Sequence, residues 1–186
     1  MHKKHKEGFA LLITIIVVGV LLTIGVSMLD ITVKQLQLSA TARDSELAFM
    51  AASAGIECTH ATRLNMGLAG GNIDTTADFY CFETNEAVTA VTESVVGDSD
   101  PEIYQFSDEI DWTIDGQEVC TQYDLYLIDA ATENTDIDYT FIGQGVDSKE
   151  CLAGNICTII FTRGYNNECT DLDNLRTVQR ELTIDF

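Results

Sequence analysis

The sequence has little proline and few basic residues. One proline, Pro101, occurs in 186 residues, and 10 basic residues stand against 30 acidic ones, which gives a net charge of −20. So acidic a chain is not expected to bind DNA or RNA directly, because that affinity comes largely from Lys and Arg contacts with phosphates. Apolar residues nevertheless make up 46% of the chain, which excludes a disordered acidic tail.

The common catalytic motifs are also missing. The sequence contains no G-x-x-x-x-G-K-[ST], no G-x-S-x-G and no H-E-x-x-H. Gly143-Gln144-Gly145 lacks the third glycine of a dinucleotide-binding loop. Acidic pairs are so frequent that none stands out as a catalytic dyad. We therefore expect a protein that is not an enzyme and that carries no cofactor.

Charge is absent from one long segment near the N-terminus. Phe9 to Leu29 run for 21 positions without a charged residue, after a leader, residues 1–8, with three lysines and one glutamate. A helix of this length spans roughly 30 Å, the thickness of a bilayer core. The basic flank predicts a single membrane crossing with the N-terminus in the cytoplasm. Beyond Leu29 the chain has 7 basic and 29 acidic residues, so the exported part is strongly acidic.

Three interpretations of this segment compete. A cleaved secretory signal has an apolar core of about 7–15 residues followed closely by a small-x-small site. Here the core is longer, and Ala40-Thr41-Ala42 lies thirteen residues past Leu29. The segment is otherwise a permanent N-terminal anchor, or an apolar helix that is kept after the leader has been trimmed.

The helical pattern does not stop at Leu29. No proline precedes Pro101 and no glycine lies between Gly25 and Gly55. Apolar residues recur at steps of three and four, interrupted once at Arg43-Asp44: Leu29, Val33, Leu36, Ala40, Leu47, Met50 or Ala51, Ala54 and Cys58. This stripe predicts one helix from about Phe9 to about Thr62, with residues 30–62 as its amphipathic half. The small residues of Leu47 to Gly55 allow close packing on the chain's own exported domain.

Residues 63–186 have the pattern of an exported β-rich domain. A loop begins near Leu64, and alternating residues in Ile110–Ile114 and Gln117–Ile128 flank Asp115-Gly116, which predicts a hairpin with a type I′ turn. Further strands are expected at Asp78–Phe82, Ala87–Val96, Tyr139–Ile142, Ile156–Thr162 and Val178–Phe186. The predicted fold class is therefore α+β, with a long N-terminal helix packed on an antiparallel sheet.

All six cysteines lie beyond the apolar run, at Cys58, Cys81, Cys120, Cys151, Cys157 and Cys169. An even number on the oxidising side of a membrane predicts three disulfides, although the sequence cannot choose among the 15 possible pairings. We favour Cys58–Cys81, from the helix end to the first loop, Cys151–Cys157 across a short loop, and Cys120–Cys169, from the hairpin to the C-terminal region. A metal site is disfavoured because no C-x-x-C is present and His60 is the one histidine beyond the leader. A catalytic thiol would have to use the same His60.

Two acidic clusters place oxygen ligands at alternate positions, as calcium prefers. They contain Asn134, Asp136 and Asp138, and Asp171 and Asp173. Neither completes a twelve-residue calcium loop with its glycine and terminal glutamate, so we expect solvated acidic loops and no resident metal.

The N-terminal residues resemble the class III signal of type IV pilins and type II secretion pseudopilins. The likeness rests on Lys3, Lys4 and Lys6, then Gly8 followed by Phe9-Ala10-Leu11-Leu12-Ile13, and it extends over residues 1–58 through Arg43-Asp44-Ser45-Glu46-Leu47-Ala48-Phe49-Met50-Ala51-Ala52. A C-terminal segment adds Arg163-Gly164-Tyr165-Asn166, Cys169, Arg176, Val178 and Arg180. The resemblance implies that prepilin peptidase cleaves between Gly8 and Phe9 and that Phe9 is then N-methylated.

One departure from the family pattern bears on the role of the subunit. The fifth residue counted from Phe9 is Ile13, where the family usually has glutamate, and an apolar residue there is more typical of minor subunits at or near a filament tip. The resemblance implies a pilin-like fold and a minor structural subunit of a type IV pilus or secretion pseudopilus. Its partners would be other pilins, prepilin peptidase, the assembly machinery and, before assembly, the cytoplasmic membrane. It would end in an extracellular filament or a periplasmic pseudopilus. The alternative is an extracellular binding domain that stays anchored in the membrane.

Overall fold

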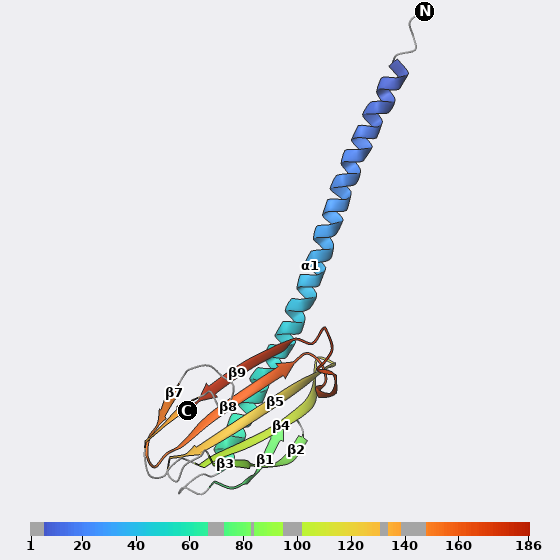
Figure 1. Cartoon of the computed structure of the whole chain (residues 1–186). Coiled ribbons are helices and arrows are strands. Elements are labelled where there is room, and N and C mark those ends of the chain that lie inside the picture. The colour runs from blue at the N-terminus through green and yellow to red at the C-terminus, as the bar shows by residue number, and fades with distance from the viewer. Residues whose placement is uncertain (1–5, 67–72, 83, 95–101, 131–133, 139–147) are drawn as a thin grey trace, which may run out of the picture. The chain divides into compact units, whose positions relative to one another are not determined.

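The computed structural model describes residues 6–66, 73–82, 84–94, 102–130, 134–138 and 148–186 (Figure 1). The chain forms two compact units, Met1–Arg43 and Asp44–Phe186, and each is described by itself. The second unit contains the last part of the long helix together with all the strands. Helix residues 44–62, which the sequence analysis groups with the amphipathic half, thus belong to the compact β-rich unit.

A single helix, α1, covers Lys6–Asn65. It extends three residues beyond the predicted helix at each end and includes Leu64, where a loop was expected to begin; neither flank contains a proline that would end the helix earlier. Asp30 and Lys34 form an ion pair at 3.0 Å along this helix, in the acid-first order that favours helices.

The principal sheet of the second unit has five antiparallel strands in the order β3-β4-β5-β8-β9 (Figure 1). They are β3 (Val91–Ser94), β4 (Glu102–Ile114), β5 (Gln117–Asp129), β8 (Ile156–Tyr165) and β9 (Gln179–Asp185). Two further pairs are β1 (Thr76–Cys81) with β2 (Thr84–Thr89), and β6 (Thr135–Asp138) with β7 (Ser148–Cys151). A short 3-10 helix, η2, covers Cys169–Asp171. These elements confirm an α+β chain whose helix packs on antiparallel sheets.

The central hairpin has the predicted turn. Ile114 pairs with Gln117, and both turn residues have positive φ, 50° at Asp115 and 81° at Gly116, as a type I′ turn requires. β4 starts at Glu102 and not at Ile110, because it pairs along the whole of β5. The acidic residues of Ser107–Glu109 obscure this part of the strand in the sequence.

Other strand predictions need correction. The strand expected over Ala87–Val96 is two strands, β2 and β3, which separate at Ala90, whose N–H donates to the Thr75 carbonyl at 2.7 Å. The sequence analysis missed β6 and β7, which are four residues each and too short and polar to show alternation. The strand expected at Tyr139–Ile142 lies outside the described residues.

Small residues bring the helix and the sheet of the second unit into backbone contact. Ala48, Ala51 and Ala52 are completely buried. A Cβ atom on Gly164 of β8 would lie 2.1 Å from the Ala48 carbonyl oxygen and 2.3 Å from the Ala52 nitrogen. Neither atom can move without distorting the helix. The expectation that the small residues of α1 pack on the chain's own domain is therefore confirmed.

Two threonine hydroxyls fix the helix on the sheet. Thr121 Oγ1 of β5 donates to the Ala51 carbonyl at 3.0 Å, and Thr162 Oγ1 of β8 donates to the Ala52 carbonyl at 2.8 Å. Both threonines are fully buried, and a buried hydroxyl without a partner would be costly.

Only the second part of the predicted stripe is buried in the chain. Leu47 and Ala51 are buried, whereas Met50, the alternative to Ala51, is exposed. Leu29, Val33, Leu36 and Ala40 are all exposed. The core on the helix side of the sheet is instead completed by residues such as Phe79, Phe106, Tyr123, Leu125 and Leu127.

We expect Gly164→Ala to destabilise the second unit by about 2–3 kcal/mol or more, because the added methyl group overlaps backbone atoms of α1. Chemical unfolding of the full chain in detergent, followed by tryptophan fluorescence, measures the change. Gly25→Ala is the matched control, since a Cβ there meets nothing within 4 Å. Equal stability of the two variants would contradict this account of the interface.

Candidate functional site

The most extensive unusual surface of the chain is the apolar part of α1. Phe9 and every residue from Leu11 to Arg43 are exposed. The apolar side chains among them include Phe9, Leu12, Ile16, Leu22 and Leu29. A helix of this kind leaves its apolar surface in water unless lipid or another protein covers it.

This part of the helix has the properties of a membrane-spanning segment. It contains an 18-residue window with mean hydropathy 2.7, so it is long and apolar enough to cross a bilayer. The Thr14 and Thr23 hydroxyls donate to the carbonyls of Leu11 and Val20, at 2.8 Å each. These polar groups are thereby satisfied within the helix, as a low-dielectric environment demands.

The predicted processing site lies in the first turns of the same helix. Gly8 and Phe9 are both helical, and Phe9 is 68% exposed. Cleavage after Gly8 and methylation of Phe9 remain predictions.

The segment Arg163-Gly164-Tyr165-Asn166 has a structural role at each position. Arg163 lies 3.7 Å from both Asp124 and Glu181, while Gly164 allows the close approach of the helix. The Tyr165 hydroxyl donates to Gln122 Oε1 at 3.0 Å. Asn166 accepts from the Val178 N–H at 2.6 Å and donates to the Arg176 carbonyl at 3.3 Å. Because Asn166 follows β8 and its partners precede β9, these bonds hold the two ends of the connecting loop together.

The three disulfides are the pairs favoured from the sequence. Cys58 bonds Cys81, Cys120 bonds Cys169, and Cys151 bonds Cys157, with sequence separations of 23, 49 and 6 residues. They join α1 to β1, β5 to η2, and β7 to β8 respectively. Since all six cysteines are bonded, none is a free nucleophile beside His60, whose ring instead meets the ring of Phe186 edge to face.

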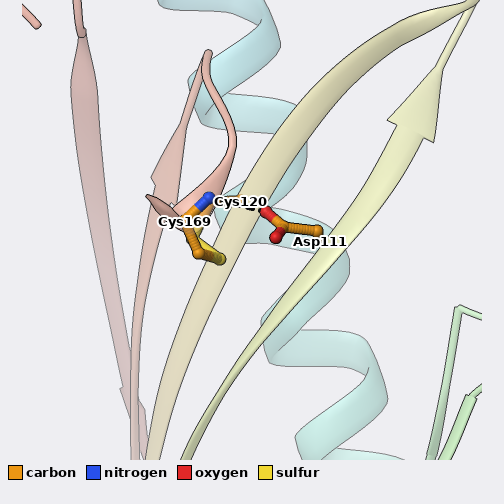
Figure 2. Close-up of side chains that lie close together, drawn as sticks. All are labelled: Asp111, Cys120 and Cys169. Carbon is orange, nitrogen blue, oxygen red and sulfur yellow. Dashed lines mark hydrogen bonds between the residues drawn. A yellow bond between two sulfur atoms is a disulfide. The ribbon is translucent and has the colours of Figure 1, made fainter. Parts of the chain in front are cut away.

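Asp111, Cys120 and Cys169 form a close group that superficially resembles a metal centre (Figure 2). Their ligand atoms lie within 4.8 Å of one another. Both sulfurs are consumed by the disulfide, however, and Asp111 Oδ1 accepts a 2.6 Å hydrogen bond from the Cys169 N–H. The group is therefore a covalent and hydrogen-bonded attachment of η2 to the sheet, which the sequence analysis did not foresee for Asp111.

The two calcium candidates differ in what surrounds them. Asn134 Oδ1 accepts from the Ala153 N–H at 2.9 Å, and Asn134 Nδ2 donates to Glu150 at 2.9 Å. The side chains of Asp136 and Asp138 lie outside the part that can be described. Asn134 therefore links the start of β6 to β7 and to the turn that follows β7.

In the second candidate, Asp171 accepts from Asn174 Nδ2 at 3.2 Å, and Asp173 is exposed. Asp171 also lines an open cavity of about 280 Å³ with Glu118 and Glu168, two residues that the sequence analysis did not group with it. The hydrogen bond with Glu118, and its negative charge, raise the pKa of Glu168. Asp171 is thus bonded within its own loop, whereas Glu168 contacts Glu118 of β5.

Comparison of the chain with protein-family models, with curated proteins and with solved structures gives no match.

We expect the disulfides to contribute unequally to stability, because the loss of unfolded-chain entropy grows with loop length. Replacing the Cys120–Cys169 pair with alanines should cost about 4 kcal/mol, and replacing Cys151–Cys157 about 2 kcal/mol. Equilibrium urea unfolding of the two double variants gives the comparison, and Cys58–Cys81 should fall between them. A larger loss from the 6-residue loop than from the 49-residue loop would contradict this order.

Proposed function

We propose that the chain is a pilin-like structural subunit that assembles through its N-terminal helix after cleavage between Gly8 and Phe9. The filament would be a type IV pilus or a type II secretion pseudopilus. The observation that carries the proposal is the combination of two properties in one helix. Residues 9–29 are uncharged, and Phe9 and Leu11 to Leu29 are exposed. From Leu47 onward the helix packs through its small buried residues into a disulfide-bonded domain.

The physical basis of assembly is the need to keep this apolar surface covered. Lipid would shelter the helix before assembly, and neighbouring helices would shelter it in the filament. Because lipid already covers the apolar groups, extraction from the bilayer gains little hydrophobic free energy. The work must therefore come from an assembly motor, which makes the pilus assembly machinery a partner of the chain.

A minor position in the filament is favoured by the charge distribution. Residues 9–29 contain no carboxylate that could neutralise the N-terminal ammonium of a neighbouring subunit in an apolar core, where an unpaired charge is costly. A neighbouring subunit with a carboxylate in its own helix can neutralise the N-terminal ammonium of this chain. This chain cannot do the same for that neighbour, because its own helix has no such carboxylate. This asymmetry suits a subunit at or near one end.

The exported domain would form the outer surface. Asp44–Phe186 carries 28 acidic and 5 basic residues, which keeps the domain soluble and repels indiscriminate close contacts. Its three disulfides suit the oxidising side of the membrane.

The proposal is tested by the N-terminus of the mature protein. We expect mass spectrometry of sheared filaments to find a chain that begins at methylated Phe9. Gly8→Val should yield uncleaved protein that stays in the membrane fraction. Gly19→Ala, in the same helix, should be processed normally, since a Cβ there contacts nothing within 4 Å.

An intact N-terminus on filament-associated protein would contradict cleavage. A chain that keeps residues 1–8 and never enters filaments would instead support the alternative, a permanently anchored surface domain.

A further inference from the structure

A fully exposed leucine stands in the loop between β8 and β9. Leu175 has the highest exposure of the large apolar residues in the described chain. Hydrogen bonds hold the loop around it: the Arg176 N–H donates to Asn174 Oδ1 at 3.1 Å, and the Thr177 N–H donates to the Asn174 carbonyl at 2.9 Å. Asn167 Nδ2 donates to Thr177 Oγ1 at 2.8 Å. The loop thus presents Leu175 to solvent from a fixed backbone.

The next residue, Arg176, supplies a positive charge that has no partner among the described side chains. Three arginines of Asp44–Phe186 are engaged: Arg63 with Thr158, Arg163 with Asp124 and Glu181, and Arg180 with Ser45. Among the arginines of this described part, Arg176 alone has no recorded side-chain bond. In a domain with 28 acidic residues, an exposed arginine without a carboxylate partner beside an exposed leucine is a distinctive pair.

A cleft with complementary properties lies where α1 ends. It has a volume of about 380 Å³, and its walls include apolar side chains and two carboxylates: Ala61, Met66, Ala77, Tyr80, Asp74 and Asp78. Both aspartates are exposed, and neither is bonded to a described residue. The C-terminal end of a helix adds partial negative charge. The cleft therefore suits an apolar side chain accompanied by a cation.

We propose that the Leu175–Arg176 pair of one copy docks into this cleft on a second copy of the chain. Leu175 would contact Ala61 and Tyr80, which are both exposed in the cleft, while the Arg176 guanidinium would meet Asp74 and Asp78. A guanidinium paired with carboxylates in a partly enclosed site is stronger than the same pair in open solvent.

The two surfaces lie at different ends of the domain. The Cys120–Cys169 disulfide holds the loop at the start of β5, beside Val119 and Leu47. The cleft begins at Ala61, roughly 20 Å further along the helix. A contact between two different patches is heterologous, so it can repeat in an open series of copies.

One nearby charge opposes this contact. Asp173 is exposed in the same loop, and it would approach the two aspartates of the cleft. Removing its charge should therefore strengthen the contact, whereas reversing the charge of Arg176 should weaken it. General repulsion between acidic domains would give both of these effects. Asp78→Arg separates the two cases, because it lowers the net negative charge: repulsion alone predicts stronger association, whereas specific docking predicts weaker association.

The role of the contact in a filament rests on the proposed function. Docking itself depends only on the two surfaces. It can therefore be measured on the full chain in detergent micelles, which cover the apolar helix. Self-association would be measured by sedimentation velocity over a concentration series. The proteins compared are the wild type, the single variants Arg176→Asp, Asp78→Arg, Leu175→Ser and Asp173→Asn, and the double variant that combines Arg176→Asp with Asp78→Arg. Glu46→Arg changes an exposed charge as Asp78→Arg does and is the matched control.

We expect Arg176→Asp and Asp78→Arg each to weaken association about tenfold or more, and the double variant to recover most of it. Leu175→Ser should weaken association, Asp173→Asn should strengthen it, and Glu46→Arg should leave it unchanged. Non-reducing mass analysis and circular dichroism verify that each variant keeps its fold.

Single variants that associate like the wild type, or a double variant no better than either single one, would overturn the docking proposal. That result would leave processing after Gly8 untouched. Conversely, unprocessed protein absent from filaments would refute the proposed function without changing the sedimentation data.

Discussion

The backbone of α1 and the backbone of β8 meet at Gly164 with no side chain between them. A close approach of this kind is possible only because the facing helix positions are Ala48, Ala51 and Ala52. It gains dispersion contacts along the interface, and it leaves room for the hydroxyls of Thr121 and Thr162 to reach helix carbonyls. The disulfide from Cys58 to Cys81 then joins the end of the same helix to the neighbouring hairpin.

The apolar residues of α1 fall into two groups, those that pack on the sheet and those that are exposed. From Leu47 onward, small residues such as Ala48, Ala51 and Ala52 are buried by the chain itself. Before Arg43, the large apolar side chains that the structure describes are exposed. Large exposed side chains need lipid or other helices, and small buried ones need a closely fitted sheet. The proposed filament role follows from this contrast, since a firmly held domain can be carried by a helix whose apolar surface is left for the environment.

Much of this architecture could be predicted from the sequence, for identifiable reasons. The absence of proline and the spacing of apolar residues predicted α1 to within three residues at each end, and Asp115-Gly116 predicted a turn whose two positive φ angles only a few residue types accept readily. The three cysteine pairs that we favoured are the ones present, although the sequence alone does not choose among the 15 possible pairings. Interactions between distant strands were less accessible. No local pattern indicates that Asp111 accepts from the Cys169 N–H, or that Glu118 and Glu168 share a cavity with Asp171. β6 and β7 were missed because four-residue polar strands depend on their partners more than on propensity.

The threonine hydroxyls of the sheet have a consequence for the opposite side of the helix. Because Thr121 and Thr162 bond successive carbonyls, at Ala51 and Ala52, this part of α1 cannot turn about its own axis without losing both bonds. The rotational orientation of this part of the helix is therefore fixed. Phe49 and Met50 are exposed on the same turn, so their side chains leave the domain in one fixed direction. The buried threonines thus determine the direction in which these exposed residues point.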